Sequence, residues 1–535
     1  MKLRQEDLKN QKPWEDAGFE LPKFNREVMI QQTKENPEWV HFGGGNIFRA
    51  FPAAVCQDLL NQGILKTGII VAEGYDYEII EKSFKEFDDL SVLVTLKADG
   101  SLEKKVIASI AESLCVDTSN SGDWGRLTEI FESESLKMVS FTITEKGYSL
   151  INQNQEFLSD VAADFLKTPE TASSYIGKLV ALCYARFRKG SIPLTLVSMD
   201  NCSHNGSKLE AAVTTFAKKW VDNKIVEPEF LTYVYESISY PWSMIDKITP
   251  RPADSVITML KEAGFEDTES VITKKNTYVA PFVNAEEAQY LVIEDKFMNG
   301  RLPLDKGGII YTDKETVDKV EKMKVCTCLN PLHTALAIFG CLLSYDKISE
   351  EMKDKELVSL VKKIGYVEGL PVVVDPGIIN PKDFIDEVLQ KRIPNPFMPD
   401  TPQRIATDTS QKLAIRFGET IKAYKADDKL EVANLNNICL TLAGWCRYLM
   451  GINDEGNSFE LSPDPMLSVL TPIFADIKLG EKVNFHELLK DVLENSNIFG
   501  VNLYEVGLGE KVEGYFAELI QGKGAVRATL KKYLD

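Results

Sequence analysis

Short apolar runs separated by amphipathic segments dominate the first half of the chain. Between the first two runs, residues 49–62 place apolar side chains at helical spacing, which predicts a helix on the surface of a sheet. Helical segments separate the later runs as well. This alternation predicts an α/β fold with a mainly parallel, doubly wound sheet. The predicted strands are 39–42, 68–73, 90–96, 139–144 and 194–198.

The second half of the chain follows a different pattern. Apolar positions recur there with helical periodicity, and β-branched runs become rare. We therefore predict one domain over 1–285 and a second, mostly α-helical domain over 286–535. The predicted helices are 286–298, 314–324, 331–344, 350–363, 380–391, 409–425, 430–450, 482–494 and 510–534.

Composition narrows the class of protein. A chain of 535 residues favours at least two domains. A net charge of −19 argues against nonspecific nucleic-acid binding, which needs a basic surface. The segment Met1–Asp7 has no apolar stretch after its positive charges, and the apolar run 335–343 is too short to span a membrane. We expect no membrane association, and no feature predicts an obligatory protein partner.

The nine cysteines are scattered and odd in number, which is typical of a reduced, cytoplasmic protein. Cys326 and Cys328 have no partner pair at metal-binding spacing. Because a closed zinc site needs about four ligands, we predict no metal site.

A glycine-rich turn follows the first predicted strand. Closely spaced Gly43 and Gly45 between a strand and a helix would allow the backbone to approach a pyrophosphate. Phe48 occupies the place of the third fingerprint glycine, so an ordinary strand-to-helix turn remains an alternative. The predicted cofactor residues are Phe42, Gly43, Gly45, Asn46, Ile47, Phe48 and, after the second strand, Glu73.

An acid at the end of the second strand can accept hydrogen bonds from the adenosine ribose. Glu73 lies 28 residues after Gly45, farther than the usual spacing of about 20. An acid there favours NAD(H) over NADP(H), whose 2′-phosphate it would repel. Asp76 is a rival for this role, and a solvated strand-end carboxylate is the structural alternative.

The frame from Arg404 to Lys412, taken with Lys324, Asn330 and His333, forms a cationic and polar set suited to a hydroxylated, anionic substrate. A lysine can transfer a proton where burial or a nearby cation lowers its pKa. Asn330 before a proline is also typical of a helix cap, and a lone histidine or lysine is more often structural than catalytic.

Two further polar residues follow predicted strands. Asn201 lies in a polar loop after strand 194–198, at the sheet edge where such folds bind ligands. Asp246 lies inside an apolar stretch. Asn201 could simply belong to a turn, and Asp246 could be a hydrogen-bonded structural acid, so both alternatives stay open.

Six segments in this order resemble the polyol-specific long-chain dehydrogenase/reductase family, over roughly residues 39–450. The resemblance implies a Rossmann-type N-terminal domain, a mainly helical C-terminal domain, NAD(P) dependence and no catalytic metal. The six segments are 42–50, 142–148, 198–201 with 205–206, 244–250, 292–297, and 323–324 with 329–330 and His333.

The resemblance also implies residue roles. Lys324 is similar to the family's catalytic lysine, and Asn330 and His333 are similar to the pair that holds the reacting oxygen. The residues similar to substrate contacts are Asn201, Asp246, Arg404 and Lys412.

One spacing departs from the family pattern. Five residues, Val325 to Leu329, separate Lys324 from Asn330, where the family usually has four. On a straight helix, six steps of about 100° would turn Lys324 away from Asn330. A bulge or kink before Pro331 would absorb the additional residue. Without one, Lys324 would be misassigned, and Lys322 would be a poorer alternative.

The expected reaction is reversible hydride transfer between NAD(H) and a small keto sugar acid or polyol. The resemblance favours D-fructuronate/D-mannonate, followed by tagaturonate/altronate and then mannitol/fructose. A protein of another class, a noncatalytic NAD(H)-binding sensor or structural protein, remains an alternative because of the five-residue spacer.

Overall fold

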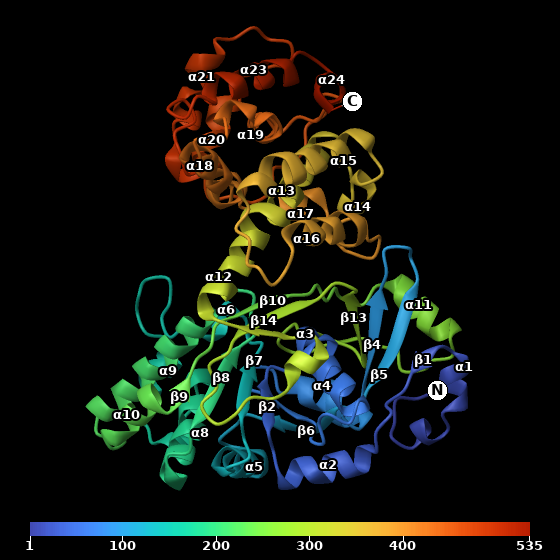
Figure 1. The fold of residues 1–535 in the computed structure, drawn as a ribbon, viewed down its shortest axis with the longest axis vertical. Helices are drawn as coiled ribbons and strands as arrows, with labels where there is room; N and C mark the ends of the chain where they lie inside the picture. Colours follow the sequence, from blue (N-terminus) through green and yellow to red (C-terminus); the bar gives the residue numbers. More distant parts are fainter. Residues whose placement is uncertain (535) are drawn as a thin grey trace. The chain divides into compact units, whose positions relative to one another are not determined.

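The computed structural model describes residues 1–534, and its central element is a six-stranded parallel sheet (Figure 1). The strand order is β6-β3-β2-β7-β8-β9, and every neighbouring pair is parallel. Renumbered within this sheet the order is 3-2-1-4-5-6, the doubly wound arrangement of dinucleotide-binding folds. The predicted α/β fold class is confirmed. The strands are β2 (Trp39–Phe42), β3 (Ile69–Glu73), β6 (Ile110–Cys115), β7 (Met138–Phe141), β8 (Leu194–Ser198) and β9 (Ile238–Ser239).

Helices cover both faces of this sheet because its strands are apolar on both sides. Val40 and Phe42 of β2 belong to one buried cluster, whereas Trp39 belongs to a second cluster. The first cluster includes residues of α5 (Ser121–Glu132), α8 (Tyr175–Gly190), α9 (Asn205–Asp222) and α10 (Glu229–Glu236). The second includes residues of α2 (Arg26–Glu35), α3 (Asn46–Ala50) and α4 (Pro52–Asn61).

The predicted strand 90–96 is present but lies outside the parallel sheet. It forms β4 (Ser91–Leu96) in a four-stranded sheet of order β1-β5-β4-β13. Its pairing with β5 (Leu102–Ile107) is antiparallel, through a short connection. Its pairing with β13 (Phe282–Glu286) is parallel, and β1 (Phe19–Glu20) lies on the other side of β5. Local alternation predicted the strand correctly and could not identify its partners.

The helix predicted over 286–298 is wrong. This segment contains the end of β13 and then β14 (Tyr290–Glu294), which pairs with β10 (Ser243–Asp246) and β15 (Ile310–Thr312). Leu291, Val292 and Ile293 are all buried. A fully buried three-residue run resembles a helix segment in periodicity, and β-branched Val292 and Ile293 favour the strand.

The chain forms two compact units. The first comprises Met1–Lys97 and Ser101–Asp318, and the second comprises Lys319–Asp535 with Ala98–Gly100. The division therefore follows Asp318, whereas the sequence pattern suggested a boundary after residue 285. The difference arises because β13, β14 and β15 pair within the sheets of the first unit.

The second unit is helical, and several of its helices contain wide, π-helical turns. These turns are η6 (Met323–Cys328), η7 (Lys363–Gly369), η9 (Val388–Arg392) and η11 (Ala414–Gly418). The helices are α13 (Asn330–Leu342), α14 (Ile348–Glu351), α15 (Lys355–Lys362), α16 (Pro381–Glu387), α17 (Pro402–Ile405), α18 (Glu419–Ala426), α19 (Asn436–Tyr448), α20 (Leu467–Phe474), α21 (Phe485–Leu493), α22 (Ser496–Phe499), α23 (Gly509–Leu519) and α24 (Ala525–Leu534).

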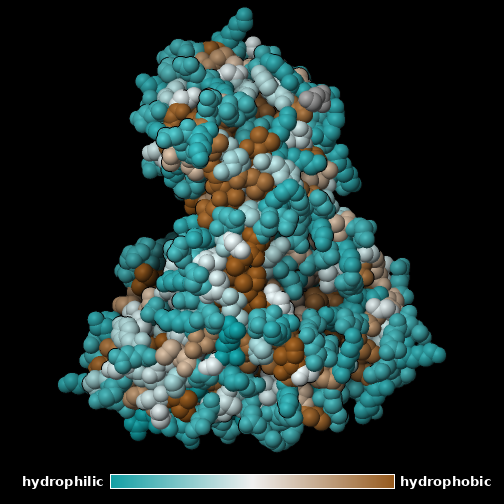
Figure 2. All heavy atoms as spheres, viewed as in Figure 1, coloured by the Kyte–Doolittle hydropathy of each residue, from teal (hydrophilic) through white to brown (hydrophobic). Residues whose placement is uncertain are grey.

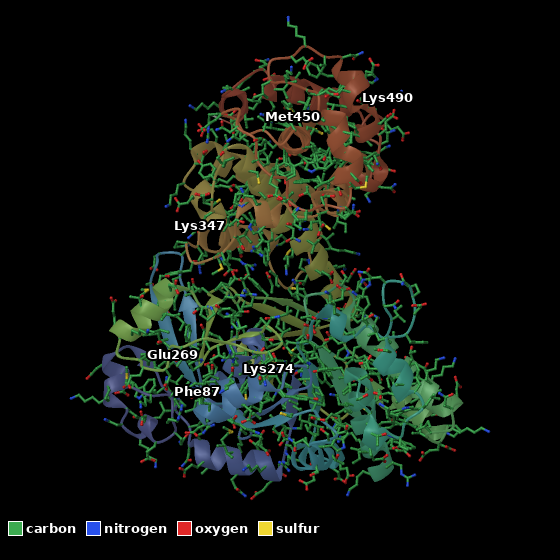
Figure 3. The ribbon with its side chains drawn as sticks, turned by 180° about the vertical axis from the view of Figure 1, so that it is seen from behind. Phe87, Glu269, Lys274, Lys347, Met450 and Lys490 are labelled. Atoms are coloured by element: carbon green, nitrogen blue, oxygen red, sulfur yellow. The ribbon has the colours of Figure 1, made fainter. Side chains whose placement is uncertain are left out.

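The core of the second unit is built around α13 and α19, which pack against each other. Trp445 and Arg447 of α19 are almost completely buried, and Arg447 donates hydrogen bonds to the carbonyl oxygens of Leu519, Ile452 and Asn453. Met450 lies just beyond the end of α19 (Figure 3).

Most side chains on the visible face are hydrophilic (Figure 2), in keeping with 26% charged residues.

One helical segment, Lys314–Leu342, is long and apolar enough to cross a membrane by length and composition alone. Of its most apolar 18-residue window, 72% is buried within the protein. A core helix meets the same criteria, and the charged residues at its start, such as Lys314 and Glu315, lie outside an apolar span.

All nine cysteines lie within residues 1–534, and each is a free thiol. Over the same residues, no group of three or more His, Cys, Asp or Glu side chains is arranged to hold a metal ion.

Candidate functional site

The glycine-rich turn begins where β2 and β7 approach each other most closely. Gly43 has a φ of +106°, and a Cβ atom there would lie 2.3 Å from the carbonyl oxygen of Thr142. A Cβ on Gly44 would lie 2.9 Å from the ring of Phe84. Both glycines are therefore required by the packing of the protein itself.

Gly45 differs from its two neighbours. It precedes α3 with extended backbone angles that any residue adopts, and a Cβ built on it meets no atom within 4 Å. Packing does not explain this glycine. Gly45 does line a cavity, so a side chain there would occupy ligand space.

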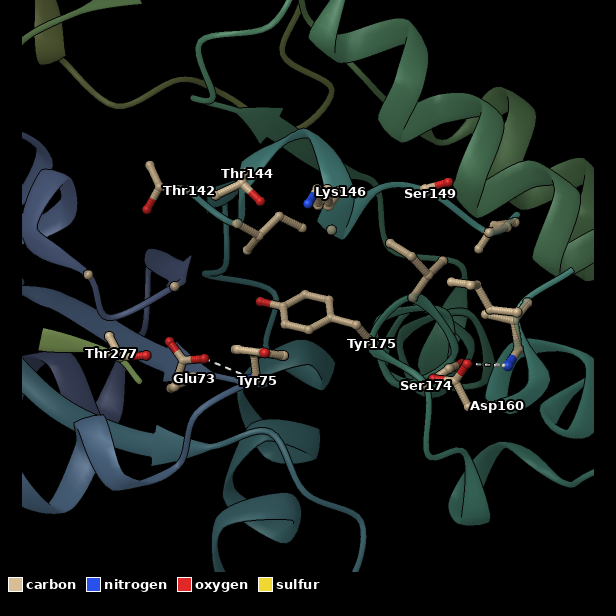
Figure 4. A pocket seen from close by; sticks show the side chains of 18 of the residues that line it. Glu73, Tyr75, Thr142, Thr144, Lys146, Ser149, Asp160, Ser174, Tyr175 and Thr277 are labelled. Carbon is tan, nitrogen blue, oxygen red and sulfur yellow. Dashed lines mark hydrogen bonds between the residues drawn. The ribbon is translucent and has the colours of Figure 1, made fainter. Parts of the chain in front are cut away.

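This cavity has a volume of about 510 Å³ and lies wholly within the first unit. Its wall includes Gly43, Gly45 and Glu73, together with Thr142 to Thr144 beyond β7 and Ser174 and Tyr175 at the start of α8 (Figure 4). It therefore opens at the carboxyl ends of β2, β3 and β7, the switch point at which doubly wound sheets bind ligands.

Tyr175 is a cavity residue that sequence reasoning missed. Its side chain is directed into the cavity (Figure 4), and its buried hydroxyl oxygen makes no hydrogen bond within residues 1–534. Burial raises the pKa of this hydroxyl well above 10, so it is a neutral donor. A buried donor without a partner indicates that a ligand supplies one.

Glu73 is buried at the end of β3, not solvated. One carboxylate oxygen accepts a hydrogen bond from the Gly44 amide at 2.9 Å, and the other accepts bonds from the amides of Tyr75 and Asp76 at 2.7 and 3.1 Å. These bonds tie the glycine turn to the next strand. Because each carboxylate oxygen has two lone pairs, acceptor capacity remains for a ribose hydroxyl.

The rival acid, Asp76, is also buried, but it accepts a hydrogen bond from Thr273 and does not line the cavity. Of the other predicted cofactor residues, Phe42 and Phe48 are completely buried, and Phe48 stacks on His41. Asn46 accepts a hydrogen bond from Arg49. Phe42, Asn46, Ile47 and Phe48 are absent from the cavity lining.

Polar side chains after β8 position the neighbouring turns. The Asp200 carboxylate accepts hydrogen bonds from the amides of Ile143 and Thr144 and from the hydroxyl of Tyr148. The Asn205 amide bonds to the backbone of β8 and to Ser243 of β10. These residues therefore fix the carboxyl ends of β7, β8 and β10 relative to one another.

The two substrate residues predicted in the first unit lie in different environments. Asn201 is exposed in the loop after β8, directly beyond the Asp200 network. Asp246 is the last residue of β10 and is 6% exposed.

In the second unit, Lys324 lies in the π-helical turn η6 and is 5% exposed. The Leu329 amide donates to the Lys324 carbonyl oxygen at 3.1 Å, a bond across five residues instead of four. Such a turn inserts one residue without breaking the helix. This turn is the bulge that the additional residue between Lys324 and Asn330 called for.

Asn330 is the first residue of α13. The N-cap position before it is Leu329, whose side chain makes no capping hydrogen bond and whose backbone angles are not helical. The side-chain amide of Asn330 makes no hydrogen bond to any side chain or backbone group within the described residues, which leaves it available to a ligand. Its carbonyl oxygen accepts a bond from Thr334.

His333 lies one turn further along α13 with 17% of its side chain exposed. Burial lowers the pKa of its imidazole to about 3, and the positive charges of Arg416, Arg404 and Arg392 lower it further. Its Nε2 is 3.5 Å from Asp400, too far for a strong hydrogen bond. The ring is thus neutral at physiological pH and can donate or accept one hydrogen bond.

The frame from Arg404 to Lys412 contains one exposed and one half-buried cation. Arg404 forms an ion pair with Asp400, which also faces His333. Lys412 donates a hydrogen bond to the Thr407 carbonyl oxygen at 2.6 Å. Burial lowers the pKa of Lys412, and the nearby Arg416 guanidinium lowers it further. Arg416, which sequence reasoning missed, therefore belongs to the same group.

Comparison with known proteins gives matches over nearly the whole chain. A family model described as the mannitol dehydrogenase Rossmann domain matches residues 37–306, and one described as the mannitol dehydrogenase C-terminal domain matches residues 316–518. A D-mannonate oxidoreductase of Thermotoga maritima is 51% identical over 99% of both chains. A mannitol 2-dehydrogenase of Emericella nidulans is 28% identical over 93% of both chains.

Two solved structures are similar along their full length. A mannitol 2-dehydrogenase of Pseudomonas fluorescens, in a ternary complex with NAD and D-mannitol, is 25% identical with a TM-score of 0.68, covering 100% of this chain and 99% of that one. A substrate-free D-sorbitol dehydrogenase is 24% identical with a TM-score of 0.78, covering 96% and 98%. The similarity to the D-sorbitol dehydrogenase supports the fold alone.

Gly45→Ala tests whether the glycine turn binds a dinucleotide. The added methyl group would enter the cavity without touching the protein, so NADH affinity should fall at least tenfold while thermal stability changes little. Gly43→Ala should instead lower the melting temperature, because its Cβ collides with backbone. Gly125→Ala, inside α5 with open space around it, is the matched control and should stabilise the helix by about 1 kcal/mol. Fluorescence titration with NADH and thermal denaturation measure both effects, and unchanged affinity in Gly45→Ala would contradict the assignment.

His333 should make the protein less stable in acid. Its pKa is about 6.5 in the unfolded chain and about 3 in the folded protein. Between these pH values only the unfolded state takes up the proton. The free energy of unfolding therefore decreases as the pH is lowered, by on the order of 1 kcal/mol per pH unit. His333→Gln lacks this group, and its melting temperature should fall less than that of the wild type between pH 6.5 and 5. Parallel curves for the two proteins would refute a neutral, buried His333.

Proposed function

Because the chain belongs to the mannitol dehydrogenase family, we propose that it is an NAD(H)-dependent oxidoreductase that interconverts D-fructuronate and D-mannonate. The observation that supports this choice of substrate is the 51% identity to a D-mannonate oxidoreductase over 99% of both chains. A dinucleotide fits the cavity beside Gly45, which is lined by the acid Glu73 and by the Tyr175 hydroxyl, a group with no hydrogen-bond partner among the residues that the structure describes. The free thiols are in keeping with a cytoplasmic enzyme.

NAD(H), when bound, supplies the hydride in reduction and accepts it in oxidation. The ketone carbon gains that hydride with its electron pair, and the ketone oxygen gains a proton, so a secondary alcohol forms. Glu73 excludes a 2′-phosphate by charge and so favours NAD(H) over NADP(H).

Asn330 and His333 would hold the reacting oxygen. Both lie on the first turn of α13, the Asn330 amide is available, and the neutral imidazole of His333 can donate one hydrogen bond. Two donors aimed at the oxygen stabilise the negative charge that develops there during hydride transfer. In a site closed to water such donors contribute several kcal/mol.

Lys324 would be the general acid and base. As the ammonium it donates the proton to the alkoxide in reduction, and as the amine it removes the alcohol proton in oxidation. Its burial and the π-helical turn η6 support this role, because the turn compensates for the additional residue before Asn330.

The remaining predicted contacts would bind the substrate chain. Arg404 and Lys412 are cations suited to donating hydrogen bonds to the hydroxyl groups of the substrate. Asn201 and Asp246 supply an amide and a carboxylate for sugar hydroxyls.

A polyol activity is the second candidate, because relatives at 28% identity are mannitol 2-dehydrogenases. The decisive experiment is NADH oxidation by the purified protein with D-fructuronate, D-tagaturonate and D-fructose side by side. We expect kcat/KM for D-fructuronate to exceed that for the other two by at least tenfold. Preference for D-fructose would favour the polyol activity, and NADH binding without turnover of any ketose would favour a noncatalytic NAD(H)-binding protein.

Lys324→Ala should lower kcat by about 10²- to 10⁴-fold, the usual contribution of a general acid, while NADH still binds. Lys322→Ala is the matched control, because Lys322 is exposed two residues earlier on the same helix. It should retain wild-type kcat. Wild-type turnover in Lys324→Ala would remove Lys324 from the mechanism, and loss of turnover in Lys322→Ala alone would transfer the role to Lys322.

A further inference from the structure

Arg416 is a half-buried arginine with few partners in the protein. Its guanidinium makes one hydrogen bond, from Nη1 to the hydroxyl of Thr334, and no ion pair with any residue the structure describes. Five N–H donors are thus served by a single neutral acceptor. Burial lowers the pKa of Arg416 to about 10, and no acidic side chain offsets this effect.

Three buried arginines, Arg26, Arg186 and Arg447, obtain several hydrogen-bond partners from the protein. Arg186 donates to the carbonyl oxygens of Phe131, Ser133, Leu136, Ile192 and Pro193. Arg26 and Arg447 likewise donate to several oxygens each. A charge removed from water without such partners is costly unless a ligand pairs with it. The contrast indicates that Arg416 is completed by an anion.

Arg416 is positioned directly beside the proposed reaction centre. It lies in η11, a π-helical turn that packs against η6 and α13. The Thr334 hydroxyl that accepts from Arg416 donates in turn to the carbonyl oxygen of Asn330. The guanidinium is thus connected through one hydroxyl group to the backbone of Asn330, the residue proposed to hold the ketone oxygen.

The proposed substrate carries its carboxylate close to its ketone. In a 5-keto sugar acid the carboxylate carbon and the ketone carbon are four single bonds apart, roughly 5 Å when extended. A carboxylate at Arg416 therefore lets the ketone reach Asn330 and His333. Lys412, whose pKa Arg416 lowers, adds a second positive charge nearby.

We propose that Arg416, supported by Lys412, binds the carboxylate of the substrate and selects sugar acids over neutral ketoses and polyols. This inference rests on the proposed function and assigns a specificity residue within it. Thr334 has a positioning role, because its hydroxyl orients the guanidinium and connects it to the turn that bears Asn330.

The test compares Arg416→Gln with Arg416→Lys and the control Lys425→Gln. Lys425 is exposed on α18, shortly after Arg416, so the control removes an equal charge without touching Thr334. Losing a hydrogen bond to a charged group costs about 10- to 150-fold in affinity. We expect KM for D-fructuronate to rise by that factor in Arg416→Gln, with kcat changed less than threefold because the carboxylate does not react.

A neutral isostere separates carboxylate recognition from folding. The wild type should bind D-mannonate at least tenfold more tightly than D-mannonamide in the presence of NAD, and Arg416→Gln should lose this preference. The preference of Arg416→Lys for D-mannonate over the amide should lie between those of the wild type and Arg416→Gln, because lysine keeps the charge without the two-pronged geometry. NADH binding reports whether each variant is folded, and the wild-type comparison holds even if Arg416→Gln does not fold.

Three outcomes would overturn the proposal. They are an unchanged KM in Arg416→Gln, an equal loss in Lys425→Gln, and a wild type that does not distinguish D-mannonate from its amide. Failure of the proposed function looks different, because the wild type would then bind NADH and turn over neither D-fructuronate nor D-mannonate.

Discussion

The contact of Gly43 with the end of β7 is the constraint on which the first unit's cavity depends. The backbone of the turn passes so close to the Thr142 carbonyl oxygen that no side chain fits. This close approach directs the chain from β2 into α3 and leaves Gly45 facing open space. The end of the next strand, the segment after β7 and the start of α8 contribute to the rest of its wall.

In the second unit, π-helical turns place the proposed functional side chains, as the glycine turn shapes the cavity in the first unit. A π-helical turn stores one additional residue in a helix, so side chains on either side of it change their relative direction. Lys324 and Arg416 both lie in such turns, η6 and η11, and the two turns pack against each other. These two turns place one buried and one half-buried cation beside α13, whose own residues are mainly apolar.

The sequence predicted four of the six strands of the parallel sheet, β2, β3, β7 and β8, and most helices of the second unit, because their burial follows regular periods. It also identified Gly43, Gly45 and Glu73, which line the cavity. It missed β6 and β9, and it assigned β14 to a helix because a short, fully buried run does not distinguish the two periodicities. Tyr175 enters the cavity from a helix more than 100 residues downstream and leaves no local signal. Arg416 was missed because sequence does not reveal whether an arginine has partners, and the hydrogen bonds that define η6 appear only in three dimensions.

The hydrogen bond from the Gly44 amide to Glu73 has a thermodynamic consequence. It holds the glycine turn in one conformation when nothing is bound, so little backbone entropy remains to be lost when a dinucleotide arrives. Association then resembles docking onto a rigid surface more than the folding of a loop. The carboxylate that we propose discriminates between two cofactors therefore also holds the neighbouring turn in place.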